Sequence, residues 1–216
     1  MIKIEKDRKV WVCSDSHFAH KNICRGVTEW RLPDGSVPLS QTRDFNTIEQ
    51  MNETIVNNIN SVVGQDDVLI HLGDWSFSGV ENIQKFRDRI LCNEIHLILG
   101  NHDTNIEKNR DNVQELFTSV NHYTKLIYKF KTFVLSHYPI QSWDGLNKGH
   151  IQLHGHVHLP TELRFGKGRK MDVGMDGHPK FGVYDMDEII KIMSGREIMS
   201  DMLFDHHTDE IKGIVG

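Results

Sequence analysis

Short apolar segments recur along the chain, and five of them run directly into side chains that can bind a divalent metal. Runs of this length are typical of buried strands. The segments are VWVC, VLIHL, IHLIL, FVL and IQL, and the side chains that follow them are Asp15 and His17, Asp74, Asn101, His137, and His156 and His158. In open α/β sheets the working site lies off the carboxyl ends of the strands. We therefore expect these side chains to converge on one rim, with enough ligands for two metal ions, which indicates an enzyme.

Between the strands, apolar residues recur at steps of three and four, the period of an amphipathic helix. This spacing predicts helices at 46–62, 80–91 and 113–120, and shorter ones at 104–109 and 187–193. Alternating strands and helices imply βα units with parallel pairing. The stretch 125–183 contains short strand-like runs separated by Gly and Pro, and it predicts a second, more antiparallel sheet.

Length and composition fit one globular domain, which we place at residues 1–195 of the 216, with 38% apolar and 25% charged residues. The tail 196–216 is expected to pack on the body or on a partner chain, so a homo-oligomer is among the expected assemblies. No apolar run approaches the ~20 residues of a membrane span, and the sequence MIKIEKDRKV lacks a signal-peptide core. The spacing of Cys13, Cys24 and Cys92 suits neither a disulfide framework nor a CxxC zinc site, so we expect a cytoplasmic protein.

The net charge of the chain helps to decide between nucleic acid and a small molecule as the substrate. The chain has 30 acidic and 25 basic residues, a formal net charge of −5. A surface that binds duplex nucleic acid shows as a basic patch, and none is visible in the sequence. Nucleic acid is therefore a weaker substrate hypothesis than a small molecule.

Side chains two apart in an extended segment point to the same side. This parity predicts that Asp15 with His17, and His156 with His158, each offer two ligands toward one place. His154 has the same parity and competes on geometry alone.

These residues resemble the motifs of calcineurin-like metallophosphoesterases, which show DSH, GD, GNHD, SH and GHVH in this order. The resemblance runs from about residue 10 to about residue 190, and MDVGMD at 171–176 is similar to the final strand of small bacterial and phage members. It implies a two-sheet α/β/β/α sandwich. It also favours His156 and His158 over His154, because the family motif is Gly-His-x-His.

The resemblance further implies the division of the ligands: Asp15, His17 and His158 for one ion, Asn101, His137 and His156 for the second, and Asp74 bridging both. Two ions ~3.5–4 Å apart activate a bridging water and clamp the ester. Oxygen and imidazole donors without thiolate favour manganese, iron or zinc. His102 is implied as the acid that protonates the leaving oxygen. Asp103 either supports a catalytic histidine or caps a helix.

The chain departs from the GDxxDRG pattern of the protein phosphatases, because residues 73–79 are GDWSFSG. A protein serine/threonine phosphatase is therefore disfavoured. The missing arginine leaves the phosphate without its positive contact. The candidates to replace it are Lys21, His20, Arg25, Arg31 and Arg43. Trp75 and Tyr138 either line the site or pack in the core. The long segment 25–43 either overhangs the metals or is a surface insertion.

The leading hypothesis is a binuclear phosphoesterase that hydrolyses small, nucleotide-like phosphodiesters, and also phosphomonoesters, by attack of a metal-bridging hydroxide. The alternatives are a DNA or RNA nuclease, a mononuclear hydrolase and a non-catalytic scaffold. The scaffold is disfavoured because His102 and all seven ligand positions are present.

Overall fold

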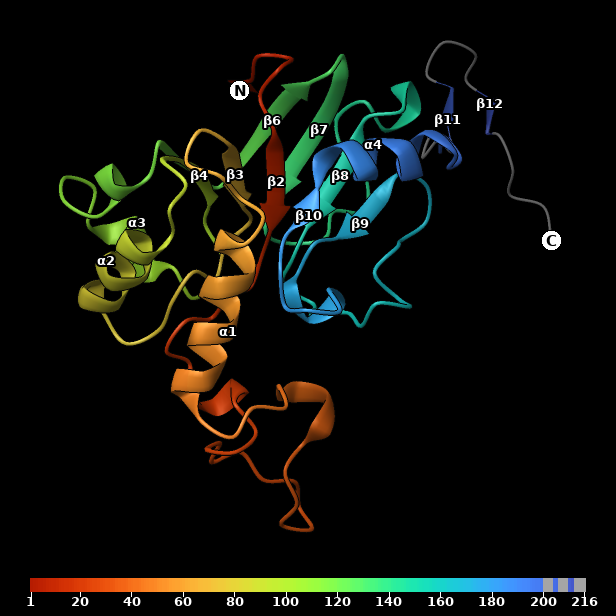
Figure 1. Cartoon of the computed structure of the whole chain (residues 1–216). Coiled ribbons are helices and arrows are strands. Elements are labelled where there is room, and N and C mark those ends of the chain that lie inside the picture. Colours follow the sequence, from red (N-terminus) through yellow and green to blue (C-terminus); the bar gives the residue numbers. More distant parts are fainter. Residues whose placement is uncertain (200–203, 206–209, 212–216) are drawn as a thin grey trace.

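The computed structural model describes residues 1–199 and two short strands beyond them, β11 (Phe204–Asp205) and β12 (Glu210–Ile211), which pair with each other (Figure 1). The tail predicted at 196–216 lies mostly outside the described residues. No helix in the described part is long and apolar enough to cross a membrane. Cys13, Cys24 and Cys92 are buried free thiols.

The first of two five-stranded sheets carries the first three predicted strands. Its order is β10-β2-β3-β4-β5, with bounds β10 (Tyr184–Asp185), β2 (Val10–Cys13), β3 (Val68–His71), β4 (Glu94–Ile98) and β5 (Ser119–Asn121). The strands β2 to β5 are parallel, and β10 runs antiparallel to β2. The carboxyl ends of the parallel strands therefore share one edge.

The second sheet carries the other two predicted strands. Its order is β1-β6-β7-β8-β9, with bounds β1 (Ile2–Lys3), β6 (Tyr123–Tyr128), β7 (Lys131–Ser136), β8 (Ile151–His154) and β9 (Lys170–Asp172). The prediction that this sheet is the more antiparallel one is wrong, because each sheet has a single antiparallel pair, β10–β2 in the first sheet and β6–β7 here. That pair is joined by Lys129 and Phe130, both at positive φ, as tight hairpin turns require. The other connections are long enough to cross over, so the strands can pair in parallel.

Four of the five predicted helices are confirmed, as α1 (Ile48–Asn60), α2 (Val80–Arg89), α3 (Thr104–Lys108) and α4 (Met186–Ser194). The helix predicted at 113–120 is wrong. A 3-10 turn at Gln114–Leu116 precedes β5, in which Val120 pairs with Leu97 of β4. A 3-10 turn repeats every three residues, so its apolar spacing imitates the start of a helix.

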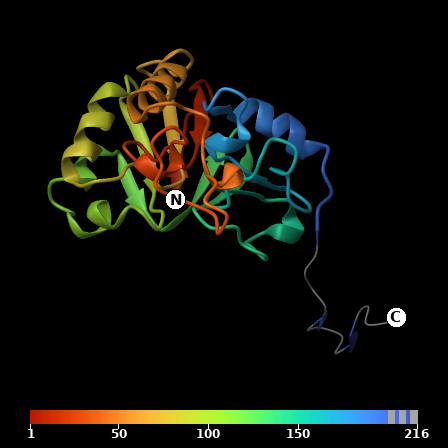
Figure 2. The same ribbon diagram turned by 90° about the horizontal axis from the view of Figure 1, so that it is seen from below.

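Two cores hold the layers together. One lies between the sheets and includes Val12, Ile70, Leu135 and Leu153, with Met186, Ile189 and Met193 of α4. The other lies between the first sheet and the helices α1 and α2, where Ile55 and Phe86 are buried. Figure 2 shows α1 (orange) and α2 (yellow) over the first sheet, and α4 (blue) contacts β10 and β2 of that sheet. The predicted sandwich of two sheets flanked by helices is confirmed.

Candidate metal centre

All seven predicted metal ligands lie in loops that leave the carboxyl ends of β2, β3, β4, β7 and β8. Two donor groups are compact enough to surround an ion, with their ligand atoms all within 4.8 Å of one another: Asp15, His17 and His158, and Asp15, Asp74 and His137. The strands come from both sheets, so the candidate centre joins the two sheets at one rim.

In the first donor group, two imidazoles face each other. The Nε2 atoms of His17 and His158 are 3.2 Å apart. Asp15 Oδ1 lies 3.9 Å from the first nitrogen and 3.8 Å from the second. His17 Nδ1 is buried without a hydrogen-bond partner. Two imidazole nitrogens directed at one point beside a buried carboxylate suit a cation that both can bind.

Asn101 lies beside His137 of the second donor group, and sequence reasoning places both with the same ion as His156. The Oδ1 atom of Asn101 lies 3.1 Å from His137 Nε2 and 2.9 Å from His156 Nδ1. His137 Nδ1 lies 2.7 Å from the carbonyl oxygen of Leu72, and a hydrogen bond there leaves Nε2 to face the site. Asp74 Oδ2 is 3.5 Å from Nε2 of both His17 and His137, the position that a shared ligand would take.

The backbone explanation for the paired ligands is wrong, although the pairs do converge. Strands β2 and β8 end at Cys13 and His154, so the pairs are not in extended segments. The ligands have left-handed φ instead: Asp15 +58°, His17 +48°, Asp74 +56°, His156 +73° and His158 +49°. Non-glycine residues seldom adopt left-handed φ values, and the positions where they do are often in functional sites. Gly155 supports the arrangement, since a Cβ there would meet Asp15 Oδ2 at 2.3 Å.

Burial and neighbouring charges shift the pKa values of several groups in the site. Burial raises the pKa of Asp15 to about 6. Burial opposes the charged form of His137, yet its hydrogen bond to Asp74 and the charges of Asp15 and Asp74 raise its pKa to about 9. Burial holds the pKa of His17 well below the usual range. Carboxyl and imidazole groups with pKa values this far from their usual range are typical of functional sites.

Asp176 is a site residue that sequence reasoning missed. One of its oxygens, Oδ2, lies 2.7 Å from His158 Nδ1. The same carboxylate accepts two hydrogen bonds from the buried Arg43, at 2.9 and 2.7 Å. Arg43 also donates to the carbonyl oxygens of Asp15 and Ser16. Burial alone would raise the pKa of Asp176, but the charge of Arg43 holds it well below the usual range.

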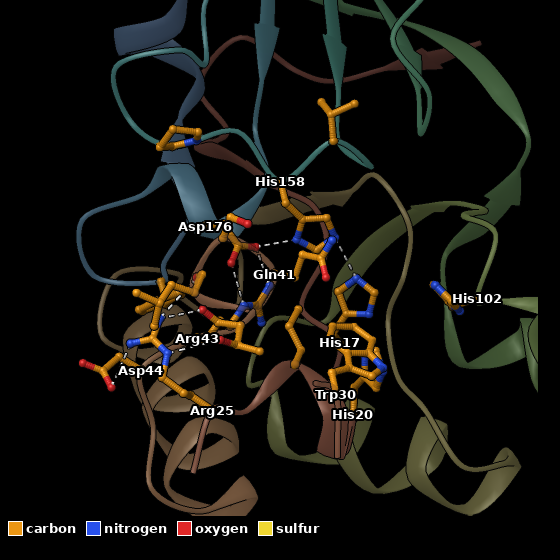
Figure 3. Close-up of a pocket in the computed structure, with 17 residues that line it drawn as sticks. His17, His20, Arg25, Trp30, Gln41, Arg43, Asp44, His102, His158 and Asp176 are labelled. Atoms are coloured by element: carbon orange, nitrogen blue, oxygen red, sulfur yellow. Dashed lines mark hydrogen bonds and ion pairs between the residues drawn. The ribbon is translucent and has the colours of Figure 1, made fainter. Parts of the chain in front are cut away.

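These contacts fix the ring of His158 and connect it to the end of the 25–43 segment (Figure 3). The MDVGMD motif at 171–176 was the available signal, because it ends in this aspartate. His154, which competed on parity, is buried with Nδ1 3.0 Å from the carbonyl oxygen of Gly155, and it packs as a neighbour of the site.

His102 lies at the rim of the site, and its ring is exposed. Its backbone N–H donates to Asp74 Oδ1 at 2.8 Å, and its ring centroid is 5.4 Å from that of His17. Asp103 is buried, and burial raises its pKa to about 6. Its carboxylate accepts hydrogen bonds from the N–H groups of Asp74, Trp75 and Gly100. Asp103 stands at the N-cap position of α3, but its side chain makes no capping hydrogen bond and instead ties together the loops after β3 and β4.

The expected phosphate contacts are mostly engaged elsewhere. Lys21 pairs with a surface glutamate, Arg31 donates to carbonyl oxygens of its own turn, and Arg25 and Arg43 hold the 25–43 segment. His20 stacks on Phe77 with ring centroids 3.6 Å apart, and it lines the cavity beside the site.

The two aromatic residues next to the predicted ligands differ in role. Trp75 is fully buried and packs edge to face on Phe18 and Phe117, so it belongs to the core. Tyr138 is 49% exposed, and its ring centroid is 4.6 Å from that of His156. Tyr138 therefore flanks the site on the side of the second donor group.

The chain belongs to the calcineurin-like phosphoesterase family, whose members are metal-dependent hydrolases of phosphate esters, because its residues 8–208 match that family. It is 32% identical over 153 residues, 70% of each chain, to the uncharacterized protein MJ1445 of Methanocaldococcus jannaschii. Its fold is similar to that of AQ665, an Aquifex aeolicus protein of unknown function (TM-score 0.60, 21% identity, 86% of this chain and 100% of that chain). An archaeal phosphodiesterase matches with a TM-score of 0.46 at 17% identity, over 79% of this chain and 87% of that chain.

Proposed function

We propose that the chain is a binuclear metal-dependent phosphodiesterase acting on small, nucleotide-like esters. The observation that carries the proposal is the facing pair of imidazole nitrogens, 3.2 Å apart, with Asp15 and Asp74 beside them. Histidine and carboxylate donors without thiolate fit manganese, iron or zinc. Asp15, His17 and His158 would hold one ion, and Asn101, His137 and His156 the other, with Asp74 shared.

Two ions bound there supply an activated water and neutralise the charge on the ester. His102 is assigned to leaving-group protonation because its imidazole is exposed beside the first donor group. Its backbone hydrogen bond to Asp74 holds it at a fixed place relative to the shared ligand. Asp176 and Arg43 orient His158, and Asp103 fixes the loop that carries Asp74.

The diester preference rests on the engaged arginines. A phosphomonoester carries more negative charge than a diester, and the protein phosphatases of the family clamp it with an arginine. Here Arg43 is buried with Asp176, and Arg25 pairs with Asp44 at 3.2 Å. Neither guanidinium is therefore free to pair with the additional negative charge of a phosphomonoester.

The test compares bis(p-nitrophenyl) phosphate with p-nitrophenyl phosphate on metal-stripped protein, with manganese, zinc or magnesium added back. We expect metal-dependent turnover that favours the diester. His102→Ala is expected to lower kcat about 10²–10⁴-fold on a dinucleotide, whose alkoxide leaving group needs the acid, and less on the p-nitrophenyl esters, whose leaving group departs as an anion. Asp74→Asn is expected to abolish turnover of all these esters through loss of the shared ligand.

Matched controls are His122→Ala, which removes a surface histidine 71% exposed, and Asp111→Asn, which changes an exposed aspartate. Both are expected to keep full activity. Absence of turnover with every metal in a folded protein would overturn the proposal. Cleavage of single-stranded DNA without hydrolysis of either small ester would support a nuclease. Binding of one metal equivalent instead of two would support a mononuclear hydrolase.

A further inference from the structure

A cavity of about 790 Å³ opens directly beside the candidate metal centre. One side is formed by His17, His102 and His158 (Figure 3). The 25–43 segment forms much of the remaining wall, with Trp30 next to His20 and residues 39–43 farther from the histidines. The segment therefore overhangs the site, as one of the two sequence interpretations expects, and the volume is typical of a small-molecule pocket.

The overhanging wall is held in place from within the protein. At the two ends of the segment, Arg25 N–H donates to the Arg43 carbonyl at 2.9 Å, and Arg43 N–H donates to the Ile23 carbonyl at 2.6 Å. The Arg25 guanidinium reaches across the segment to the carbonyl oxygens of Leu39 and Thr42, at 3.3 and 3.0 Å. The pocket is thus formed before any ligand arrives, which lowers the entropy lost on binding.

The wall presents apolar surface to the cavity. Trp30 is 36% exposed, Leu39 69% and Val157 40%. Trp30 lies edge to face with His20, with centroids 5.9 Å apart, which leaves much of its ring accessible. Ile23, Pro160 and Phe181 extend the apolar lining. A flat hydrophobic group would remove this surface from water and stack on the indole.

The charges of the wall exclude a second phosphate as the occupant. The two arginines that line the cavity, Arg25 and Arg43, already donate to carbonyl oxygens and form ion pairs with Asp44 and Asp176. The side chains of Ser40 and Gln41 form no hydrogen bond within residues 1–199, so they can meet polar atoms at the edge of a ligand. The lining therefore suits an uncharged ring with polar edges.

We propose that this cavity binds the nucleobase of a phosphodiester whose phosphate lies at the metal centre, with Trp30 and Leu39 as specificity residues. The inference rests on the proposed phosphodiesterase function. A nucleobase is planar, uncharged and polar at its edges, and base stacking on an aromatic side chain tolerates any base.

The experiment compares two esters that share a leaving group, thymidine 5′-(p-nitrophenyl phosphate) and methyl p-nitrophenyl phosphate. We expect the wild-type protein to prefer the thymidine ester about tenfold in kcat/KM. Trp30→Ala and Leu39→Ala are expected to remove most of that preference while leaving methyl ester turnover within about twofold. The matched control is Leu91→Ala, which removes a leucine 51% exposed on another part of the surface and is expected to keep the preference.

Equal kcat/KM for the two esters in the wild type, or a preference that survives in both variants, would overturn the inference and leave the proposed function standing. Calorimetric titration with thymidine 5′-monophosphate adds a measurement that needs no turnover. Affinity lost in Trp30→Ala supports the pocket even where hydrolysis fails, which would then count against the proposed function alone. Affinity unchanged in Trp30→Ala would overturn the pocket.

Discussion

The ring of His158 is held by a carboxylate that is itself held by a buried guanidinium. Asp176 lies 2.7 Å from His158 Nδ1, so a hydrogen bond there leaves Nε2 directed at His17. Carboxylates that orient metal-binding histidines in this way fix the tautomer and raise the basicity of the ligand nitrogen. Asp176 is therefore expected to act on metal affinity through His158.

Asp176→Asn is expected to weaken binding of the ion at the first donor group about 10–100-fold. The amide keeps the shape of the side chain but loses the negative charge that supports His158 and pairs with Arg43. Competition against a fluorescent chelator measures the affinity, and retained metal after gel filtration measures the stoichiometry. Asp144→Asn, at an exposed aspartate, is the control. Wild-type affinity in Asp176→Asn would contradict the assigned role.

Sequence reasoning could place the candidate ligands at one rim because each follows an apolar strand, and strand ends are visible as apolar runs. It failed on Asp176 and Arg43 because their pairing joins residues 133 positions apart. It also gave the wrong reason for the convergence of Asp15 and His17, since a left-handed φ leaves no mark in the residue type there. The direction of the strands in the second sheet was likewise hidden, because apolar alternation is the same in parallel and antiparallel strands.

At the scale of elements, the segment between β2 and α1 depends on a close approach of its two ends. Gly26 N–H donates to the Phe45 carbonyl at 2.8 Å. A Cβ on Gly26 would meet backbone atoms of Asn46 at 2.2 to 2.6 Å, closer than real contacts allow. The glycine is therefore required by space at this position.

Gly26→Ala is expected to lower the free energy of unfolding by about 1–3 kcal/mol, the range for forced overpacking, and to loosen the wall of the cavity. Urea denaturation measures the change. Gly64→Ala is the control, since its nearest neighbour is an Asp67 side chain at 3.6 Å. Equal stability of the two variants would show that the ends of the segment can separate without loss.

At the scale of the whole molecule, the candidate ligands come from both sheets. Asp15, Asp74 and Asn101 follow strands of the first sheet, and His137 and His158 follow strands of the second. Ions bound among them would connect the sheets at the rim. Any ligand that binds only the folded state raises its stability by mass action.

Metal addition is therefore expected to raise the Tm of the metal-stripped protein, and the rise is expected to grow with pH up to about 9. The pKa of His137 is raised to about 9 in the metal-free site, so below that pH the ion has to displace a proton. Thermal melts with zinc or manganese between pH 6.5 and 9.5 measure the effect. A rise in Tm that is independent of pH, or one that persists unchanged in Asp74→Asn, would contradict it.

Because the two ends of the 25–43 segment are joined, holding the strands in place and selecting the ester are tasks of different residues. The backbone hydrogen bonds from Arg25 to Arg43 and from Arg43 to Ile23 join the two ends of the segment, so its interior can change in length or composition without moving the strands. Loops with ends joined in this way accept insertions at little thermodynamic cost. Relatives with the same metal rim can thus diverge in the esters they select by exchanging this one segment. A chimaera that keeps Gly26 and carries another member's segment at residues 27–41 is expected to inherit that member's choice of ester.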